Sequence, residues 1–319
     1  MNPFRPHFLV AGGHRQTLLG YWRRRRIEWG LPVEDVVVDA DGVRLLLRAS
    51  WQPAPREARP AVVLLHGLGG WDGAKYVLAA GQLAFSRGWH VVRMNLRGAG
   101  DGMSLSPVLY NAGLDADLAA VLEAVARQSP RLAVLGFSLG ANLSLLLLSR
   151  RSERLPPGFV GAVGVSPPLD LAACAAALER SSNRLYQVYF MKNLRRAYRE
   201  RQAARPDLFK SGLEQGVRTV REYDERITAP YGGYRDAAEY YARSSAGPRL
   251  AAIRHPALIL AAWDDPMIPG ESVARWPLSP FVTREMLPTG GHVGFVARSA
   301  APGGFWAAER ALDFLEERA

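Results

Sequence analysis

Short apolar runs recur along the 319 residues of the chain and predict the strands of a β-sheet. Residues 33–39 and 43–51 flank Asp41-Gly42, a dipeptide typical of hairpin turns, so these two runs predict a β-hairpin. The run at residues 61–65 is continuously apolar, as expected for a strand that a parallel sheet buries on both faces. Further strands are expected at residues 90–95, 131–136, 159–165, 257–262 and 281–287.

Helical patterns separate several of these strands. They cover residues 74–87, 112–127 and 139–150, and a last helix is expected at residues 305–318. Strands that alternate with helices are typical of a parallel sheet covered by helices. The sequence therefore predicts an α/β fold in which helices flank a mostly parallel, eight-stranded sheet.

The alternation stops between residues 170 and 250, where the pattern becomes polar, aromatic and mostly helical. We expect a helical lid at 170–250, inserted after the sixth strand of a catalytic domain that comprises 1–169 and 251–319, with an N-terminal arm at about 1–30. The aromatic residues of the lid either line a substrate pocket or pack within the lid itself. They are Tyr186, Tyr189, Phe190, Tyr198, Tyr223, Tyr231, Tyr234, Tyr240 and Tyr241.

The segment Gly136-Phe137-Ser138-Leu139-Gly140 matches the Gly-x-Ser-x-Gly nucleophile elbow. This motif needs a tight turn from a strand into a helix, which lifts the serine above the sheet and leaves room only for glycine beside it. A predicted buried strand precedes the segment and an apolar helix follows it, which is the required context. We therefore predict that Ser138 is the nucleophile of a serine hydrolase. The alternative is a glycine-flanked turn in which the serine only caps a helix.

A serine hydroxyl needs a general base to act as a nucleophile at neutral pH. In α/β-hydrolases the acid and then the histidine follow the serine along the chain. His292 is the only histidine after the last predicted strand, and it lies in the glycine-rich loop Gly290-Gly291-His292-Val293-Gly294. We predict that His292 is the general base.

The acid is expected just after the strand at residues 257–262, where Asp264 and Asp265 stand side by side. The spacing from Asp265 to Pro269, across an apolar pair, favours Asp265, whose role would be to orient the imidazole. Asp264 is the alternative acid, and Asp170, after the sixth strand, is a third candidate.

Two backbone N–H groups are expected to form an oxyanion hole. One belongs to Leu139, the residue after the nucleophile, and the other to Leu68, in the loop His66-Gly67-Leu68-Gly69-Gly70 after the third strand. We expect His66 to fix this loop through its side chain. The segment Gly98-Ala99-Gly100 is an incomplete dinucleotide-binding motif, because position 103 is Met, so we interpret it as a structural turn that Arg97 anchors.

The chain carries a formal net charge of +10. Basic residues cluster at residues 23–26 and again in the predicted lid, at Lys192, Arg195, Arg196, Arg199, Arg201 and Arg205. These clusters fit a solvated surface, and peripheral contact with an anionic membrane is the alternative. No zinc finger or ribonucleoprotein motif accompanies them, so we expect no nucleic-acid partner.

No run of about 20 apolar residues predicts a spanning helix, and no secretory signal is evident at the N-terminus, so a cytoplasmic protein is expected. Cys174 is the only cysteine, which excludes an intramolecular disulfide. It stands in an alanine-rich run at residues 171–178, where we expect a small buried apolar residue rather than a nucleophile.

Together these motifs resemble the YheT-like α/β-hydrolases, the plant EMB8-like proteins and the animal abhydrolase-domain lipases. The resemblance implies hydrolysis of a small-molecule or lipid ester by Ser138, Asp265 and His292, with no metal or organic cofactor. The phrases that carry it span the chain. They are Gly13-His14-Arg15-Gln16-Thr17, His66-Gly67-Leu68-Gly69-Gly70, Asn95-Leu96-Arg97-Gly98, Gly136-Phe137-Ser138-Leu139-Gly140-Ala141-Asn142, Tyr240-Tyr241, Asp264-Asp265-Pro266 and Gly291-His292-Val293-Gly294-Phe295.

The expected function is therefore cleavage of carboxylic esters, with short- to medium-chain acyl esters or acylglycerol-like lipids as substrates. The same residues would serve a thioesterase, an amidase or an acyltransferase, and a non-catalytic binding protein is a further alternative. The arginine run at residues 23–26 has no counterpart in the resemblance, and the pattern gives it no role.

Overall fold

The computed structural model describes residues 3–6, 10 and 12–319, so part of the expected N-terminal arm lies outside the described residues. An eight-stranded sheet runs through it in the order β1-β2-β4-β3-β5-β6-β7-β8. The strands are β1 Glu34–Ala40, β2 Val43–Ser50, β3 Ala61–Leu65, β4 His90–Met94, β5 Leu132–Phe137, β6 Phe159–Val165, β7 Ala257–Ala262 and β8 Val282–Leu287. The α/β-hydrolase fold predicted from the sequence is confirmed.

The first two strands form the expected antiparallel hairpin, and β2 also pairs antiparallel with β4. All the other strand pairs are parallel. Their carboxyl ends therefore meet at one edge of the sheet, which is where open α/β folds place their ligands. Ser138, Asp265, His292 and Leu68 all follow such strand ends.

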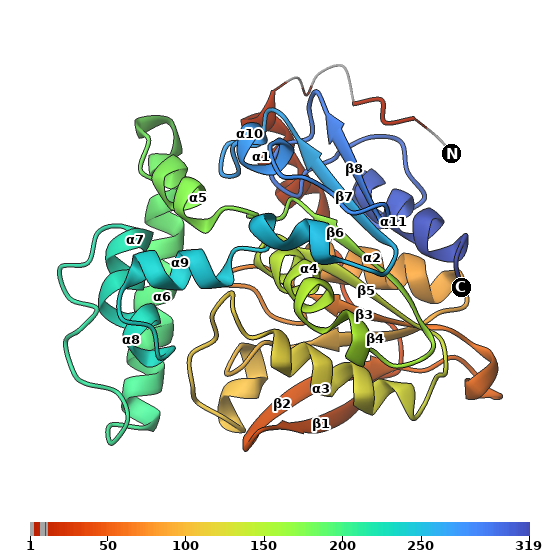
Figure 1. Ribbon diagram of the computed structural model, residues 1–319, viewed down its shortest axis with the longest axis horizontal. Helices are drawn as coiled ribbons and strands as arrows, with labels where there is room; N and C mark the ends of the chain where they lie inside the picture. The colour runs from red at the N-terminus through yellow and green to blue at the C-terminus, as the bar shows by residue number, and fades with distance from the viewer. Residues whose placement is uncertain (1–2, 7–9, 11) are drawn as a thin grey trace.

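Helices cover both faces of this sheet (Figure 1). In β3 the residues alternate between two cores: Ala61, Val63 and Leu65 pack with α3 and α4, whereas Val62 and Leu64 pack with α2 and α11. All five side chains of β3 are fully buried, which explains its continuously apolar sequence. The flanking helices are α2 Lys75–Ser86, α3 Asp115–Ala126, α4 Leu139–Arg151 and α11 Trp306–Glu316.

Between β6 and β7 the chain forms a group of helices, here called the helical insertion, which gathers at one side of the sheet (Figure 1). Its helices are α5 Leu171–Leu178, α6 Arg184–Ala204, α7 Val220–Tyr223, α8 Ala229–Tyr231 and α9 Ala237–Ser244. A short π-helix, Asp224–Thr228, continues α7 into α8. Among the described residues, no helix has the length and apolar content needed to cross a membrane.

Two helices were not predicted. The short α10, Gly270–Ala274, follows β7, and α1, Gly13–Arg24, lies near the N-terminus. The residues that α1 buries are Gly13, Gln16, Gly20 and Arg24, so its inner face carries no apolar side chain. A helix of this kind has no hydrophobic periodicity for sequence analysis to detect.

Candidate active site

Ser138 stands at the turn between β5 and α4, as the elbow motif requires. Its backbone has φ 51° and ψ −119°, a conformation that is strained for a residue other than glycine. The turn packs tightly against the loop after β3: a Cβ on Gly140 would lie 2.6 Å from the carbonyl oxygen of His66. The elbow therefore holds the serine in one fixed position between the two loops.

A chain of hydrogen bonds joins three of the residues singled out in the sequence. Ser138 Oγ lies 3.0 Å from His292 Nε2, and His292 Nδ1 lies 2.9 Å from Asp265 Oδ2. With the imidazole proton on Nδ1, that nitrogen donates to the carboxylate and Nε2 accepts from the serine hydroxyl. The side chains of His292 and Asp265 are 11% and 2% exposed, so water competes little for these bonds.

The two neighbouring aspartates have different partners. The second oxygen of Asp265, Oδ1, accepts from the backbone N–H groups of Met267 and Ile268 at 2.9 and 3.0 Å. Asp264 instead binds the histidine loop, where its Oδ1 accepts from the N–H groups of Gly290 and Gly291, both at 2.9 Å. The structure thus brings Asp265 to the imidazole and Asp264 to the backbone of the loop that carries it.

Asp170, the third candidate acid, lies outside this chain of hydrogen bonds. Its Oδ1 caps the first turn of α5 by accepting from the N–H of Ala173, and its Oδ2 pairs with Arg275. Both oxygens therefore have structural partners at the start of the helical insertion.

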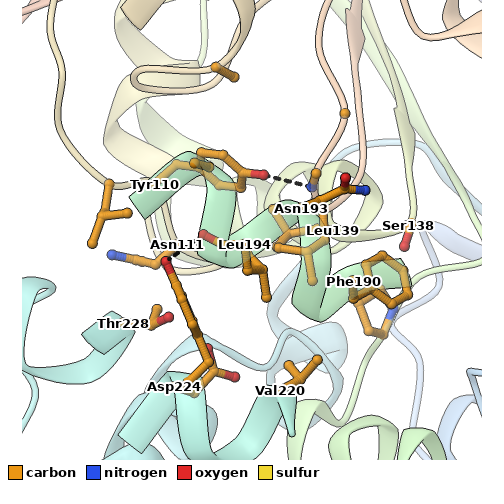
Figure 2. A pocket seen from close by; sticks show the side chains of 18 of the residues that line it. Tyr110, Asn111, Ser138, Leu139, Phe190, Asn193, Leu194, Val220, Asp224 and Thr228 are labelled. Atoms are coloured by element: carbon orange, nitrogen blue, oxygen red, sulfur yellow. Dashed lines mark hydrogen bonds between the residues drawn. The ribbon is translucent and has the colours of Figure 1, made fainter. Parts of the chain in front are cut away.

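The loop after β3 is fixed by two partly buried tyrosine side chains. The N–H groups of Gly67 and Gly69 donate to the hydroxyls of Tyr76 and Tyr110, at 2.9 and 2.7 Å (Figure 2 shows the Tyr110 bond). Between these two glycines, the N–H of Leu68 has no partner among the described residues. The N–H of Leu139 belongs to the first turn of α4, where a helix offers no internal acceptor.

The imidazole of His66 also fixes this loop. The N–H of Leu96 donates to Nε2 of His66 at 3.2 Å, so the imidazole proton is on Nδ1, which donates to the carbonyl oxygen of Gly67 at 2.8 Å. Burial lowers the pKa of His66 to about 4, which keeps the ring neutral at neutral pH. Arg97, in the next loop, pairs with Asp117 of α3 through two bonds of 2.6 Å.

Helix α1 braces the two loops that carry Asp265 and His292. Thr17 Oγ1 accepts from the N–H of His292 at 2.8 Å and donates to the carbonyl oxygen of Gly13. A Cβ on Gly13 would lie 1.6 Å from the carbonyl oxygen of Asp264. The first residue of the helix therefore packs directly against the loop that carries Asp264 and Asp265. Sequence analysis assigned neither Thr17 nor Gly13 a role.

Arg24, at the other end of α1, also holds the histidine loop in place. It is 3% exposed, and its guanidinium donates to the carbonyl oxygens of Val293 and Gly294 at 2.7 and 3.1 Å. The group also lies 4.3 Å from the ring centre of Phe305. Burial lowers the pKa of Arg24 to about 9, which still leaves it cationic at neutral pH. This residue of the arginine run is thus a support of the histidine loop rather than a surface charge.

A cavity of about 440 Å³ opens beside Ser138 and His292. Its other walls come mostly from the helical insertion and from the loops after β3 and β4. Four aromatic residues from the predicted set line it: Phe190, Tyr223, Tyr240 and Tyr241. Tyr198 and Tyr231 instead bond to each other, at 3.2 Å between the hydroxyls, so some members of the aromatic set line the cavity and others pack within the insertion.

The family of this chain is shown by comparison with known proteins. The family described as the alpha/beta hydrolase fold matches residues 60–298. The chain belongs to this family. The match spans β3 to the histidine loop and so contains every residue of the hydrogen-bonded chain, but it begins after α1.

Relatives in the alpha/beta hydrolase family cover different shares of the chain. YheT of Escherichia coli is 33% identical over 95% of this chain and 89% of its own length. The monoacylglycerol lipase of Saccharomyces cerevisiae is 32% identical over 82% of this chain, which spans only 60% of that protein. A solved esterase from Pyrococcus furiosus shares the fold, with a TM-score of 0.59, 16% identity and coverage of 91% of this chain and 92% of its own.

Other features predicted from composition have structural explanations. Cys174 is buried and lines the cavity, and burial raises the pKa of its thiol. Arg201, from the basic cluster of the insertion, is 3% exposed and donates to the carbonyl oxygens of Gly98 and Val108. Within the described part of the chain, no group of three or more His, Cys, Asp or Glu side chains is placed to hold a metal ion.

Proposed function

We propose that this member of the alpha/beta hydrolase family cleaves carboxylic esters through an acyl-enzyme, with Ser138, His292 and Asp265 as its catalytic triad. The observation that carries the proposal is the continuous chain of hydrogen bonds from Ser138 Oγ to Asp265 at the wall of a cavity large enough for a small ester. The elbow conformation of Ser138 supports it independently.

The first half of the reaction forms the acyl-enzyme. Ser138 Oγ attacks the ester carbonyl carbon while His292 Nε2 takes the hydroxyl proton. Asp265 stabilises the imidazolium that results and keeps the ring in the tautomer that accepts at Nε2. The imidazolium then donates its proton to the departing alkoxide, and the alcohol leaves.

The oxyanion that develops in this step is assigned to the N–H groups of Leu68 and Leu139. Both belong to segments that flank Ser138, and the Leu68 N–H has no partner in the described structure. One such donor is worth about 3–4 kcal/mol of transition-state stabilisation. Water then attacks the acyl-enzyme with His292 as base, the carboxylic acid is released, and Ser138 regains its proton.

The proposed substrate class rests on the side chains that line the cavity and on the helical insertion that covers it. Leu139, Leu194 and Val220 give it apolar walls, which suits a short- to medium-chain acyl group. The helical insertion supplies two of these three side chains, so we assign it the role of a lid over the catalytic domain. The names of the relatives support an ester rather than a thioester or amide, since one is a monoacylglycerol lipase.

The test is hydrolysis of p-nitrophenyl esters from acetate to palmitate, with Ser138→Ala and His292→Ala measured beside the wild type. We expect a maximum at intermediate chain length and a loss of roughly 10⁴- to 10⁶-fold in kcat/KM for both variants. A fluorophosphonate probe should label the wild type and leave Ser138→Ala unlabelled. Ester hydrolysis that survives Ser138→Ala would refute the assignment.

A further inference from the structure

Two polar groups in the cavity wall lie at opposite ends of an apolar stretch, and Asp101, Asn193, Arg196, Glu200 and Arg201 also line the cavity. Ser138 lies at one end, and Asn111, Thr228 and Asp224 lie at the other, as Figure 2 shows. The side chains of Leu139, Leu194 and Val220 lie between the two ends in the same view. A simple alkanoate would leave the second polar end in contact with a methyl group, which neither hydroxyl nor carboxylate can bind.

Asp224 is the charged member of this second end. Its Oδ2 accepts from the hydroxyl of Tyr241 at 2.8 Å, and the hydroxyl of Thr228 also bonds to the carboxyl group. Burial raises the pKa of Asp224 to about 6 in spite of these bonds and the charge of Arg221. No Lys, Arg or His of the described chain forms a salt bridge with it, and Arg221 itself pairs with Glu179 at 3.5 Å.

Asn111 provides the complementary donor. Its Oδ1 accepts from the N–H of Gly113 at 2.8 Å, which leaves its amide nitrogen as the free end of the side chain. Asn111 is 6% exposed and lines the cavity, yet within residues 12–319 nothing accepts from that nitrogen. The amide nitrogen of this cavity-lining residue is therefore available to donate to a ligand.

We propose that this distal polar end, formed by Asp224, Thr228 and Asn111, binds a hydroxyl group on the far end of the ester arm that occupies the cavity. The preferred substrate is then a hydroxylated ester rather than a plain alkanoate. The inference rests on the proposed function for the cleavage step and adds the substrate class to it.

A hydroxyl fits this set better than a charged group does. It donates to the Asp224 carboxylate and accepts from the Asn111 amide, so one group uses both side chains at once. An ammonium group has donors only and would face the Asn111 N–H groups without an acceptor to offer. A carboxylate on the substrate would meet the like charge of Asp224, which costs rather than gains.

The first experiment needs only the wild-type protein. Measure kcat/KM for p-nitrophenyl alkanoates and for ω-hydroxyalkanoates of equal length, and in parallel for acetate esters of alkanols and of the matching alkanediols. The two series distinguish an acyl arm from an alcohol arm in the cavity. We expect the hydroxylated ester to be preferred by about 10- to 100-fold at one chain length, as one hydrogen bond to a charged group allows.

The second experiment assigns the preference to Asp224. Asp224→Asn should reduce the ratio of hydroxylated to plain ester to within about threefold of unity, whereas Asp207→Asn, an exposed carboxylate of the same insertion, should leave the ratio unchanged. A melting curve of each variant shows that it is folded. No preference in either wild-type series, a preference for ω-ammonium esters, or a ratio unaffected in folded Asp224→Asn would overturn the proposal. Absence of all ester hydrolysis would instead refute the proposed function.

Discussion

The support that Arg24 gives to the histidine loop leads to a quantitative prediction. In Arg24→Met the side chain keeps its length and apolar stem but loses both bonds, to Val293 O and Gly294 O. These carbonyls directly follow His292, whose own N–H is held by Thr17. The substitution therefore leaves one side of the loop attached to α1 and releases the other.

The magnitude follows from the contacts. Two hydrogen bonds from a charged donor are worth about 1.5–3 kcal/mol each, and the stacking on Phe305 adds about 1 kcal/mol. Against this, methionine does not carry the cost of burying a charge, which is why the pKa of Arg24 is depressed. We expect the free energy of unfolding to fall by about 2–4 kcal/mol. A shift of the imidazole by about 1 Å would lower kcat by roughly 100-fold.

The assay compares Arg24→Met with Arg26→Met, which removes an exposed charge from the same run. Both variants are unfolded in urea, and their kcat and KM for a p-nitrophenyl ester are measured well below the midpoint. Arg24→Met should lower kcat with little change in KM, because substrate binding does not use the loop backbone. Arg24→Lys, which can still reach one carbonyl, should lie between. A stable Arg24→Met protein with wild-type kcat would refute the reasoning.

Three further predictions follow from other contacts. Asp265→Asn should lower kcat by about 10⁴-fold through the wrong imidazole tautomer, whereas Asp264→Asn, which keeps an oxygen for the glycine N–H groups, should cost less than about tenfold, measured on one ester. Gly13→Ala should destabilise the protein by more than about 2 kcal/mol in urea, because the added Cβ would overlap the carbonyl oxygen of Asp264. The preference for hydroxylated esters should weaken as the pH falls below about 6, where Asp224 takes up a proton, and the ratio of the two kcat/KM values isolates this effect because His292 acts on both substrates.

The sheet and the elbow were predictable because their signals are local. A strand buried on both faces must be apolar throughout, as β3 and β5 are, and a tight turn before α4 must carry glycine. The order of residues along the chain then left His292 as the predicted base. Local signals could not choose between Asp264 and Asp265 beyond their spacing, since that choice depends on which carboxylate faces the imidazole.

Sequence patterns could predict neither the contacts of α1 with the two loops nor the distal polar end of the cavity. Helix α1 buries Gly13, Gln16, Gly20 and Arg24, which repeat at helical spacing but are not apolar, so only the contacts with the loops reveal their purpose. The cavity joins Asn111, from the loop before α3, to Asp224, which lies more than a hundred residues later. Their proximity depends on how the helical insertion packs against the catalytic domain.

Arg24 and Asp224 both carry the cost of removing a charge from water, but their surroundings differ. Arg24 is a buried charge and Asp224 is a partly buried one, neither forms a salt bridge among the described residues, and desolvation shifts the pKa of each toward its neutral form. The guanidinium of Arg24 donates to two backbone carbonyl oxygens, so its hydrogen bonds are made within the protein. Asp224 faces a cavity instead.

The raised pKa of Asp224, from 3.8 to about 6, means that the folded protein becomes less stable as the pH rises through this range, by up to about 3 kcal/mol. Asp224→Asn should therefore stabilise the protein at about pH 8 and have little effect at about pH 4, as expected for a residue whose partner arrives with the substrate.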